Sequence, residues 1–442
     1  MIAEFKIANF YSLRDVQTLS FIPTNDDTSR DIYTEEVADG VSLLKMGCIY
    51  GSNASGKTNI LKALDFFAGF MVNDGLNKGD EIGLVPFLLD DVSDKERTSF
   101  EMTFYINREK YKLNLELDNR VIYEETLQVY TSVQPTLLYK RTYDAETAST
   151  GIAFGGKIGL VKKSREAISA NTINNRTVIA AFGVSNVEKS KLNLVYDFFS
   201  NRIAPIMYPQ NNLMSFTKRR LTKNKDGRLK KFILHFLRAS DFNISDISIH
   251  DDEVMITPEM ELIIKNTPSL SEYAKEEELK RRTLRSDEMF FVHHTDNGYK
   301  ELDEELESRG TKRYLGLATL LYDLLIHGSI LPIDEIESSI HYELLSYFIK
   351  VFLVNSKRGG QLLFSTHDIN LLDEDYIRRD VVWFTDKNDC GETQLIRLSA
   401  LGLHKTLSAY NAYKQEKLVN LPFLDSIYMD LDEYYDEEVA EK

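Results

Sequence analysis

The sequence contains only two cysteines, Cys48 and Cys390, among 442 residues. Two thiols do not build a disulfide framework or a zinc site, and this usage suits a reducing compartment. No uninterrupted apolar run reaches the roughly 18 residues of a membrane span, so we expect no transmembrane helix. The first residues also lack the apolar segment of a signal peptide. These absences predict a cytoplasmic protein.

Repeats and long heptad patterns are absent too, which argues against a solenoid and against a long coiled coil. The formal net charge is −16. Such acidity argues against a protein that coats nucleic acid non-specifically, although it leaves room for a local basic patch. Hydrophobic residues make up 43% of the chain, enough for a substantial core. The length predicts one large core with an inserted lobe, or two domains.

The spacing of apolar residues changes along the chain. Residues 85–145 alternate with period two and predict an antiparallel sheet. Residues 308–385 alternate between helical and buried-strand patterns, which indicates a parallel sheet. We expect a first half of a nucleotide-binding head in residues 1–145 and an inserted, partly helical lobe in 146–300. The second half of the head would span 301–405, and 406–442 would be an extension with an acidic tail.

One segment matches the phosphate-loop pattern G-x-x-x-x-G-K-[ST] in full. An expected buried strand precedes it and an amphipathic helix follows, as this loop requires. Its backbone N–H groups would bind phosphate oxygens, Lys57 would reach the β and γ phosphates of ATP, and Thr58 would bind Mg²⁺. The alternative is a chance glycine turn before a helix. The matching residues are Gly51, Ser52, Asn53, Ala54, Ser55, Gly56, Lys57 and Thr58.

Two adjacent acids, Asp334 and Glu335, end an apolar segment that is typical of a buried strand. Neighbouring carboxylates repel each other unless a cation lies between them, so their placement favours a metal. Asp334 would hold Mg²⁺ and Glu335 would act as general base toward the attacking water. The alternative is a solvated turn at the end of a strand.

Two further features flank the acid pair. Ser308 and Gly310 open the helix before it, where the serine suits an N-cap and the glycine permits close backbone approach. His367 ends the strand after it, where it would bond the γ-phosphate and sense hydrolysis. The alternative for His367 is a surface histidine at a strand end.

The motifs GSNASGKT, ESRGT, LPIDE and STHD occur in the order of the ABC-type ATPases of the Rad50- and SMC-like group, which the chain therefore resembles. The resemblance implies an α/β fold, an ABC-type P-loop NTPase head with a mixed sheet, an antiparallel β layer and an inserted lobe. It implies Mg²⁺-dependent ATP hydrolysis in a head-to-tail dimer. Ser308 and Gly310 would then contact ATP held by the second copy, and residues 338–341 would cross the interface.

Segments at both ends resemble, more narrowly, ATPase subunits of bacterial abortive phage-resistance systems of the AbiLi/RloA kind. They are NFYSLRDVQTLSFIP, IYGSNASGKTNILKAL, PFLLD, IDEIESSIHYELL, FSTHDINLLD and HKTLSAYNAYKQEKLVNLPFLD. This resemblance implies a sensor or regulatory subunit that controls a separate effector or toxin in antiphage defence. The family's Mg²⁺-contacting glutamine has no counterpart, since Gln128 falls in an expected strand. Phe10 or Tyr11 would stack on adenine or, more commonly for such residues, lie in the core.

Two segments carry dense charge of one sign. Residues 217–231 hold eight Lys or Arg and one Asp. They predict either a phosphate-backbone contact through Lys218, Arg219 and Arg220 or a solvated, mobile loop. Residues 425–442 hold eight Asp or Glu and one Lys. They predict either a docking tail for a basic partner or a disordered, solubilising end.

Two other functions compete with the regulatory ATPase. A nuclease of the overcoming-lysogenization type would need roughly a hundred residues after the switch histidine, by family resemblance, whereas 75 follow His367. A DNA-repair ATPase of the Rad50 type would carry a long coiled-coil arm, which the sequence lacks. A toxin-like or nuclease-like neighbouring gene would favour the regulatory ATPase, and an isolated gene would favour repair.

Overall fold

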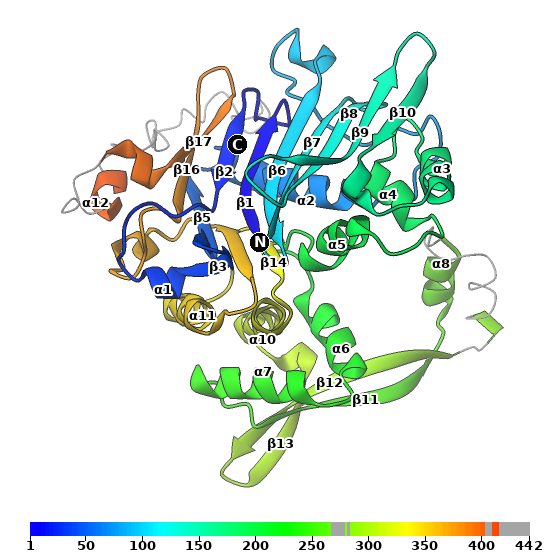
Figure 1. Ribbon diagram of the computed structural model, residues 1–442. Helices are drawn as coiled ribbons and strands as arrows, with labels where there is room; N and C mark the ends of the chain where they lie inside the picture. Colours follow the sequence, from blue (N-terminus) through cyan, green and yellow to red (C-terminus); the bar gives the residue numbers. More distant parts are fainter. Residues whose placement is uncertain (267–278, 281–282, 403–408, 415–442) are drawn as a thin grey trace, which may run out of the picture.

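The computed structural model describes residues 1–266, 279–280, 283–402 and 409–414. At its centre is a five-stranded sheet in the order β14-β15-β5-β16-β17 (Figure 1). The first four strands are parallel, and β17 pairs antiparallel with β16. Every residue of β14, β15 and β5 is buried, as expected where both faces of a parallel sheet are covered. The bounds are β5 Met46–Gly51, β14 Ile330–Ile333, β15 Gln361–Ser365, β16 Val382–Lys387 and β17 Thr393–Arg397.

A second sheet of seven strands has the order β10-β9-β8-β7-β6-β1-β2 and is antiparallel throughout. Its alternation of buried and partly exposed residues matches the period-two pattern of the sequence. Its strands are β1 Ile2–Ala8, β2 Gln17–Ser20, β6 Thr98–Ile106, β7 Glu109–Leu117, β8 Ile122–Tyr130, β9 Thr136–Asp144 and β10 Ser149–Phe154. A small pair, β3 Thr34–Ala38 and β4 Val41–Leu44, precedes β5.

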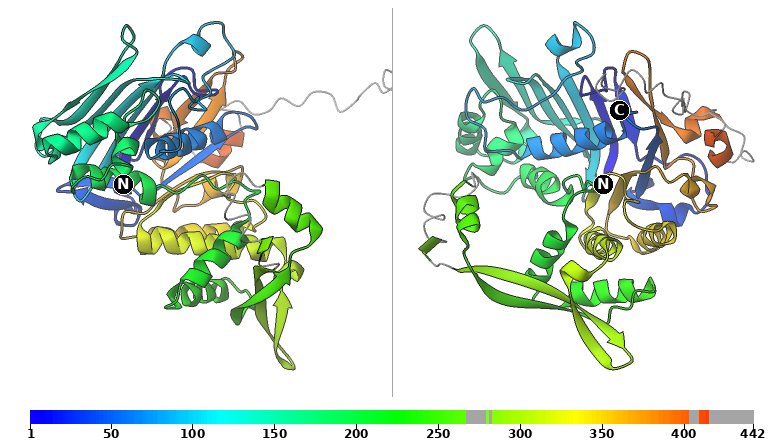
Figure 2. Two further views of the ribbon diagram at one scale, coloured as in Figure 1. Left: turned by 90° about the vertical axis from the view of Figure 1, so that its right-hand side faces the viewer. Right: turned by 180° about the vertical axis from the view of Figure 1, so that it is seen from behind.

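Helix α2 (Lys57–Met71) lies between the two large sheets (Figure 2). Its buried stripe packs on β5, β14 and β15 on one side. On the other side, the Phe67 ring lies 5.4 Å from that of Phe5 on β1 and 5.3 Å from that of Phe100 on β6. Such tilted aromatic contacts contribute beyond simple burial of area. One continuous core therefore fixes the helix that begins at the phosphate loop.

Helices α10 (Arg309–Tyr322) and α11 (Tyr342–Asn355) cover the other side of the parallel sheet (Figures 1 and 2). Helix α6 (Leu213–Lys223) packs tightly on α10. A Cβ placed on Gly316 would come within 2.3 Å of the Cβ of Leu213, so only glycine permits this approach. The Thr217 and Thr319 hydroxyls meet across the same contact at 3.0 Å. Helix α10, whose N-cap is Ser308, is thus packed firmly against the inserted lobe.

Of the expected inserted segment 146–300, strand β10 instead joins the seven-stranded sheet, and helices α6 and α7 (Arg228–Ala239) form the inserted lobe together with a three-stranded antiparallel sheet, lowermost in Figure 1. Its strands are β11 Asp246–Met255, β12 Thr283–Thr295 and β13 Gly298–Asp303. The interpretation of residues 217–231 as a mobile loop is wrong, because most of them belong to α6 and α7. Helix α7 forms because Leu229, Ile233 and Phe236 repeat at helical spacing and are buried, whereas Arg228 and Lys231 are exposed.

The remaining α-helices are short. They are α1 Arg30–Tyr33, α3 Lys162–Asn171, α4 Val178–Gly183, α5 Lys191–Asp197, α8 Pro258–Asn266 and α12 Ala409–Lys414. The acidic segment 425–442 lies outside the described residues. In the part of the chain that is described, no helix is long and apolar enough to cross a membrane.

Candidate nucleotide site

The phosphate loop joins the buried strand β5 to helix α2, as the sequence predicts. Gly56 precedes the helix with a φ of 104°, and a Cβ there would lie 2.2 Å from Thr393 Oγ1. The Lys57 ammonium donates hydrogen bonds to the carbonyl oxygens of Gly51 at 2.9 Å and Ser52 at 3.0 Å. The loop thus presents a helix N-terminus with a lysine folded across it, which is an anion-binding arrangement.

Asp334 brings the acid strand to the phosphate loop. The Thr58 hydroxyl donates to Asp334 Oδ2 at 2.9 Å, and the Ser365 hydroxyl donates to Asp334 Oδ1 at 2.5 Å. These residues come from α2, from the end of β14 and from the end of β15. Parallel strands end at the same edge of a sheet, which is where ligands of open α/β sheets bind. Asp334 is only 6% exposed, so its carboxylate is held in one place.

Glu335 and His367 lie at the same edge but are more open to solvent. The Glu335 N–H donates to Ser365 Oγ at 2.8 Å, and its backbone has a φ of 45°, which is uncommon for a non-glycine residue. Its side chain is 48% exposed, and Glu335 Oε1 is 3.9 Å from His367 Nε2. The carboxylate and the imidazole therefore face the same space beside Asp334.

Burial and neighbouring charge shift two pKa values at this edge. Burial lowers the pKa of Lys57, and the nearby carboxylates of Asp334 and Glu335 only partly counteract it. Burial, and then the positive charge of Lys57, lower the pKa of His367. The imidazole is therefore neutral near pH 7 and remains able both to donate and to accept a hydrogen bond.

Ser308 and Gly310 do not join this cluster within their own chain. The Ser308 hydroxyl caps α10 by accepting from the Thr311 N–H at 3.0 Å. A Cβ on Gly310 would lie 3.1 Å from the carbonyl oxygen of Ser339, which places this turn beside the loop after the acid strand. Among the described residues, neither has a hydrogen bond to the phosphate loop. Ser308 is exposed at the start of the helix.

Sequence reasoning did not predict that the segment leading to Gln210 runs beside the acid strand. Residues 203–207 run parallel to β14, with bridges Ile203 to Ile330 and Met207 to Ile333, and the Asp334 N–H donates to the Met207 carbonyl at 2.8 Å. Gln210 follows this segment by three residues, at the edge where Asp334 follows β14. Its only sequence signal is a short apolar stretch before MYPQ, which lacks a strand pattern of its own.

Glu337 was also missed. Its Oε1 accepts the His367 N–H at 2.6 Å and so ties the loop after β14 to the loop after β15. The signal for it was a third acid two residues after Glu335, but its partner depends on strand order. Gln128, by contrast, lies within β8 opposite Lys112 of β7 and belongs to the antiparallel sheet.

The two early aromatics separate into different environments. Phe10 is buried in a cluster with Phe66 and Phe100, with ring centroids 5.6 Å apart in both pairs. Phe10 is therefore part of the core. Tyr11 is only half-buried and the Lys62 ammonium lies 5.0 Å from its ring centroid, so Tyr11 is the aromatic that remains accessible.

The donor set suits Mg²⁺ bound together with phosphates. The Thr58 hydroxyl and the Asp334 carboxylate supply hard oxygen ligands that already touch. Among the described residues, no group of three or more His, Cys, Asp or Glu side chains could hold a metal alone. Mg²⁺ typically takes one or two protein oxygens and completes its shell with phosphates and water. These residues therefore fit the ion.

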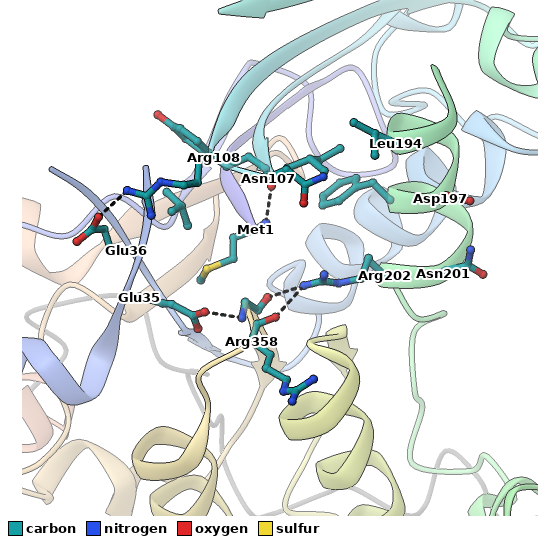
Figure 3. Close-up of a pocket in the computed structure, with 15 residues that line it drawn as sticks. Met1, Glu35, Glu36, Asn107, Arg108, Leu194, Asp197, Asn201, Arg202 and Arg358 are labelled. Atoms are coloured by element: carbon teal, nitrogen blue, oxygen red, sulfur yellow. Dashed lines mark hydrogen bonds and ion pairs between the residues drawn. The ribbon is translucent and has the colours of Figure 1, made fainter. Parts of the chain in front are cut away.

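A cavity of about 520 Å³ has Glu35, Arg108 and Arg202 in its wall (Figure 3). Gly359, which lines it, precedes the start of β15, whereas Ser365 at the end of β15 touches Asp334. Arg108 in its wall pairs with Glu36, and Arg202 donates to the carbonyls of Arg358 and Gly359. The cavity is separate from the nucleotide site.

The phosphate loop, with Asp334 and His367 at adjacent strand ends and an antiparallel layer over α2, gives the chain the architecture of a P-loop ATPase head of the ABC type. The sequence matches the family described as "AAA domain, putative AbiEii toxin, Type IV TA system" over residues 48–373, and the chain belongs to this family. The sequence prediction of fold class is thereby confirmed.

Two solved structures resemble the chain along most of its length. The SMC head domain from Thermotoga maritima is 13% identical, with 90% of this chain and 98% of that chain covered and a TM-score of 0.40. An SMC head bound to the C-terminal winged-helix domain of ScpA is also 13% identical, with 93% and 99% covered and a TM-score of 0.41. No curated protein matches the sequence.

Proposed function

We propose that the chain binds ATP with Mg²⁺ at the phosphate loop and hydrolyses it. The observation that carries this proposal is the contact of Thr58 with Asp334, which joins the two halves of the site beside Lys57. Lys57 would donate to the β and γ phosphates, while Thr58 and Asp334 would hold the ion. Mg²⁺, when bound, would neutralise charge on the phosphate oxygens.

Glu335 is the proposed general base and His367 the proposed contact to the γ-phosphate. Both face the space beside Asp334, and Glu335 is open enough to solvent to orient a water. The neutral imidazole of His367 can donate to a phosphate oxygen without adding charge at the site. We assign Gln210 as the glutamine that approaches the ion, since it leaves the sheet beside Asp334.

The site would be completed by a second copy of the chain. Among the described residues, Ser308 and Gly310 have no hydrogen bond to the phosphate loop of their own chain, and Ser308 is exposed at a helix N-terminus. A helix N-terminus favours negative charge, so it suits a γ-phosphate presented by another molecule. Two copies arranged head to tail would enclose two nucleotides, and hydrolysis would loosen them.

The biological role we propose is that of a sensor or regulatory ATPase in antiphage defence, in the cytoplasm. The motif resemblance to AbiLi/RloA-like subunits and the toxin–antitoxin description of the family support it. The chain would control a separate effector or toxin protein. The alternatives of a Rad50-like repair ATPase and of an overcoming-lysogenization-type nuclease have no specific support in the described structure.

Measuring ATP turnover tests the enzymatic proposal. Wild-type protein should hydrolyse ATP with Mg²⁺ and lose this activity in EDTA. Glu335→Gln should lower kcat by about 10²- to 10⁴-fold with KM nearly unchanged, because a base acts in the transition state and not in binding. Asp334→Asn should raise the Mg²⁺ concentration needed.

Asp373→Asn, a change at an exposed acid that ends the short 3-10 helix after His367, is the matched control and should behave as wild type. Full activity in the Glu335→Gln variant would remove Glu335 from the chemistry. Activity that persists in EDTA would remove the ion from the proposal.

A further inference from the structure

The residues directly before Ser308 contact the inserted lobe through two acidic side chains, Glu304 and Glu307. Strand β13 ends at Asp303, and a short helical turn leads from it to Ser308. The Glu307 side chain, only 7% exposed, points back to the lobe, where its Oε1 lies 2.5 Å from His293 Nε2. His293 belongs to β12, so the residue directly before Ser308 is fastened to the three-stranded sheet.

A second acid before Ser308 is held by the two neighbouring helices. The Lys218 ammonium of α6 lies 2.6 Å from Glu304 Oε2 as an ion pair. The Lys312 ammonium of α10 donates to the Glu304 carbonyl oxygen at 3.1 Å. Glu304 and Glu307 thus connect β12, α6 and α10 at the point where the chain enters the serine–glycine turn.

The direction of His293 is set by the strand. His293 pairs with Lys300 and His294 with Tyr299 across the β12–β13 hairpin. Successive strand residues point to opposite faces, so only one of the two histidines can reach Glu307. The His294 ring instead lies 5.3 Å from that of Tyr299 in an edge-to-face contact. His294 therefore serves as a control histidine, because it adjoins His293 but points away from Glu307.

We propose that His293 and Glu307 are positioning residues for the composite ATPase site. Their contact fixes the position and orientation of the turn formed by Ser308 and Gly310, and this turn acts on the nucleotide of the second copy. The inference rests on the proposed head-to-tail dimer. Positioning of this kind matters because a displacement of about 1 Å can cost on the order of 100-fold in rate. Neither residue touches the phosphate loop of its own chain.

Single variants give the first test. His293→Ala and Glu307→Ala should lower kcat about 10- to 100-fold while the KM for ATP changes less than about threefold, because the phosphate loop is untouched. Glu307→Gln keeps an oxygen that accepts from the imidazole and should retain most of the activity. His294→Ala should match wild type. Wild-type turnover in both His293→Ala and Glu307→Ala would overturn the proposal.

Mixing variants separates positioning from misfolding. His293→Ala supplies an intact Lys57, and Lys57→Ala supplies an intact serine–glycine turn. A mixed dimer of the two therefore contains one complete site, so activity on mixing should rise well above that of either protein alone. A variant that simply fails to fold would restore nothing, and that result would overturn the positioning role.

The mixture of Ser308→Ala with Lys57→Ala is the control for the dimer itself. If this pair regains activity and the His293→Ala pair does not, only the role of His293 is wrong. If the Ser308→Ala pair also stays inactive, the composite site fails and the inference falls with it.

Discussion

At the scale of single residues, the site depends on side chains whose hydrogen bonds cross between strands. Asp334 accepts from Thr58 and from Ser365, and the same Ser365 oxygen accepts the Glu335 N–H. One serine therefore orients both acids, although it belongs to neither the phosphate loop nor the acid strand. These shared contacts hold the buried Asp334 carboxylate and the backbone of the more exposed Glu335 in place.

A buried ion pair between Arg378 and Asp380 holds the N-terminal segment around Thr24 beside the start of β16. Arg378 donates to both oxygens of Asp380 at 2.9 and 2.6 Å, and the Thr24 N–H donates to the same carboxylate. Both side chains are almost fully buried. Burial alone would raise the pKa of Asp380, but the hydrogen bonds from Arg378 and Thr24 outweigh it, and the pKa is lowered from the ordinary value of 3.8.

Asp380→Asn should destabilise the protein by about 3–5 kcal/mol at pH 7, because Arg378 is left as a buried, uncompensated charge. A carboxylate with a lowered folded-state pKa stabilises above its unfolded pKa and loses this effect as pH falls through the folded pKa. The gap between wild type and variant should therefore be constant above about pH 5 and shrink below about pH 4.

Urea unfolding at several pH values measures this gap. The exposed Asp15→Asn change, on a surface carboxylate that is 75% exposed, should shift stability by less than about 0.5 kcal/mol. A gap for Asp380→Asn that grows toward acid pH would contradict the account.

Residues that act within one contiguous motif could be predicted from the sequence. Lys57 and Thr58 stand at fixed offsets from Gly51, so their location in the loop follows from the letters alone. The bond of Ser365 to Asp334, the bond of Glu337 to the His367 N–H and the contact of Met207 with Asp334 could not be predicted. These contacts depend on which strands adjoin β14, and strand order is set by the packing of the whole core.

At the scale of elements, the close contact of α6 with α10 sets the position of the serine–glycine turn. It depends on Gly316, whose missing side chain lets Leu213 approach. Gly316→Ala should force the helices apart and cost about 1–3 kcal/mol, as other overpacked sites do. Because α10 begins at the turn, ATP turnover should also fall.

The matched control for this change is Gly69→Ala in α2. A Cβ there meets nothing within 4 Å, so alanine should be neutral or stabilise by up to about 1 kcal/mol through its helix preference. Thermal unfolding compares the two variants. Equal stability of Gly316→Ala and wild type would show that the helices can separate freely.

The periodicity of apolar residues in the sequence predicted some helices and strands but not others. The strand–loop–helix unit around the phosphate loop and the alternation after Ser308 were predicted because each pattern is local. The charge of the basic stretch, residues 217–231, was compatible with a loop. Leu229 and Ile233 are nevertheless buried at helical spacing, so the end of this stretch begins helix α7. The many charged residues made the amphipathic pattern of α7 hard to recognise in the sequence.

At the scale of the molecule, the lobe divides the cations of residues 217–231 into paired and exposed ones. Lys218 and Arg220 are paired with Glu304 and Asp323, so they are committed to the packing of the lobe. Arg219, Lys223 and Lys231 are exposed on α6 and α7 instead. If nucleic acid binds, these outward cations would contact its phosphates.

Lys223→Ala and Lys231→Ala should each weaken binding of duplex DNA and reduce the slope of log affinity against log salt by about 1. Fluorescence anisotropy at several salt concentrations measures both quantities. Lys163→Ala, at an exposed lysine of α3, should leave them unchanged. Equal affinity for all three variants would exclude this surface as the contact.

The central claim is that ATP joins two copies of the chain, each completing the other's site. Light scattering on Glu335→Gln measures this directly, because a protein that binds ATP without turning it over should keep the two copies together. With ATP and Mg²⁺ the variant should show twice the monomer mass, whereas without nucleotide, or with Lys57→Ala added, it should remain a monomer. A variant that binds ATP and stays monomeric at every protein concentration would contradict the account.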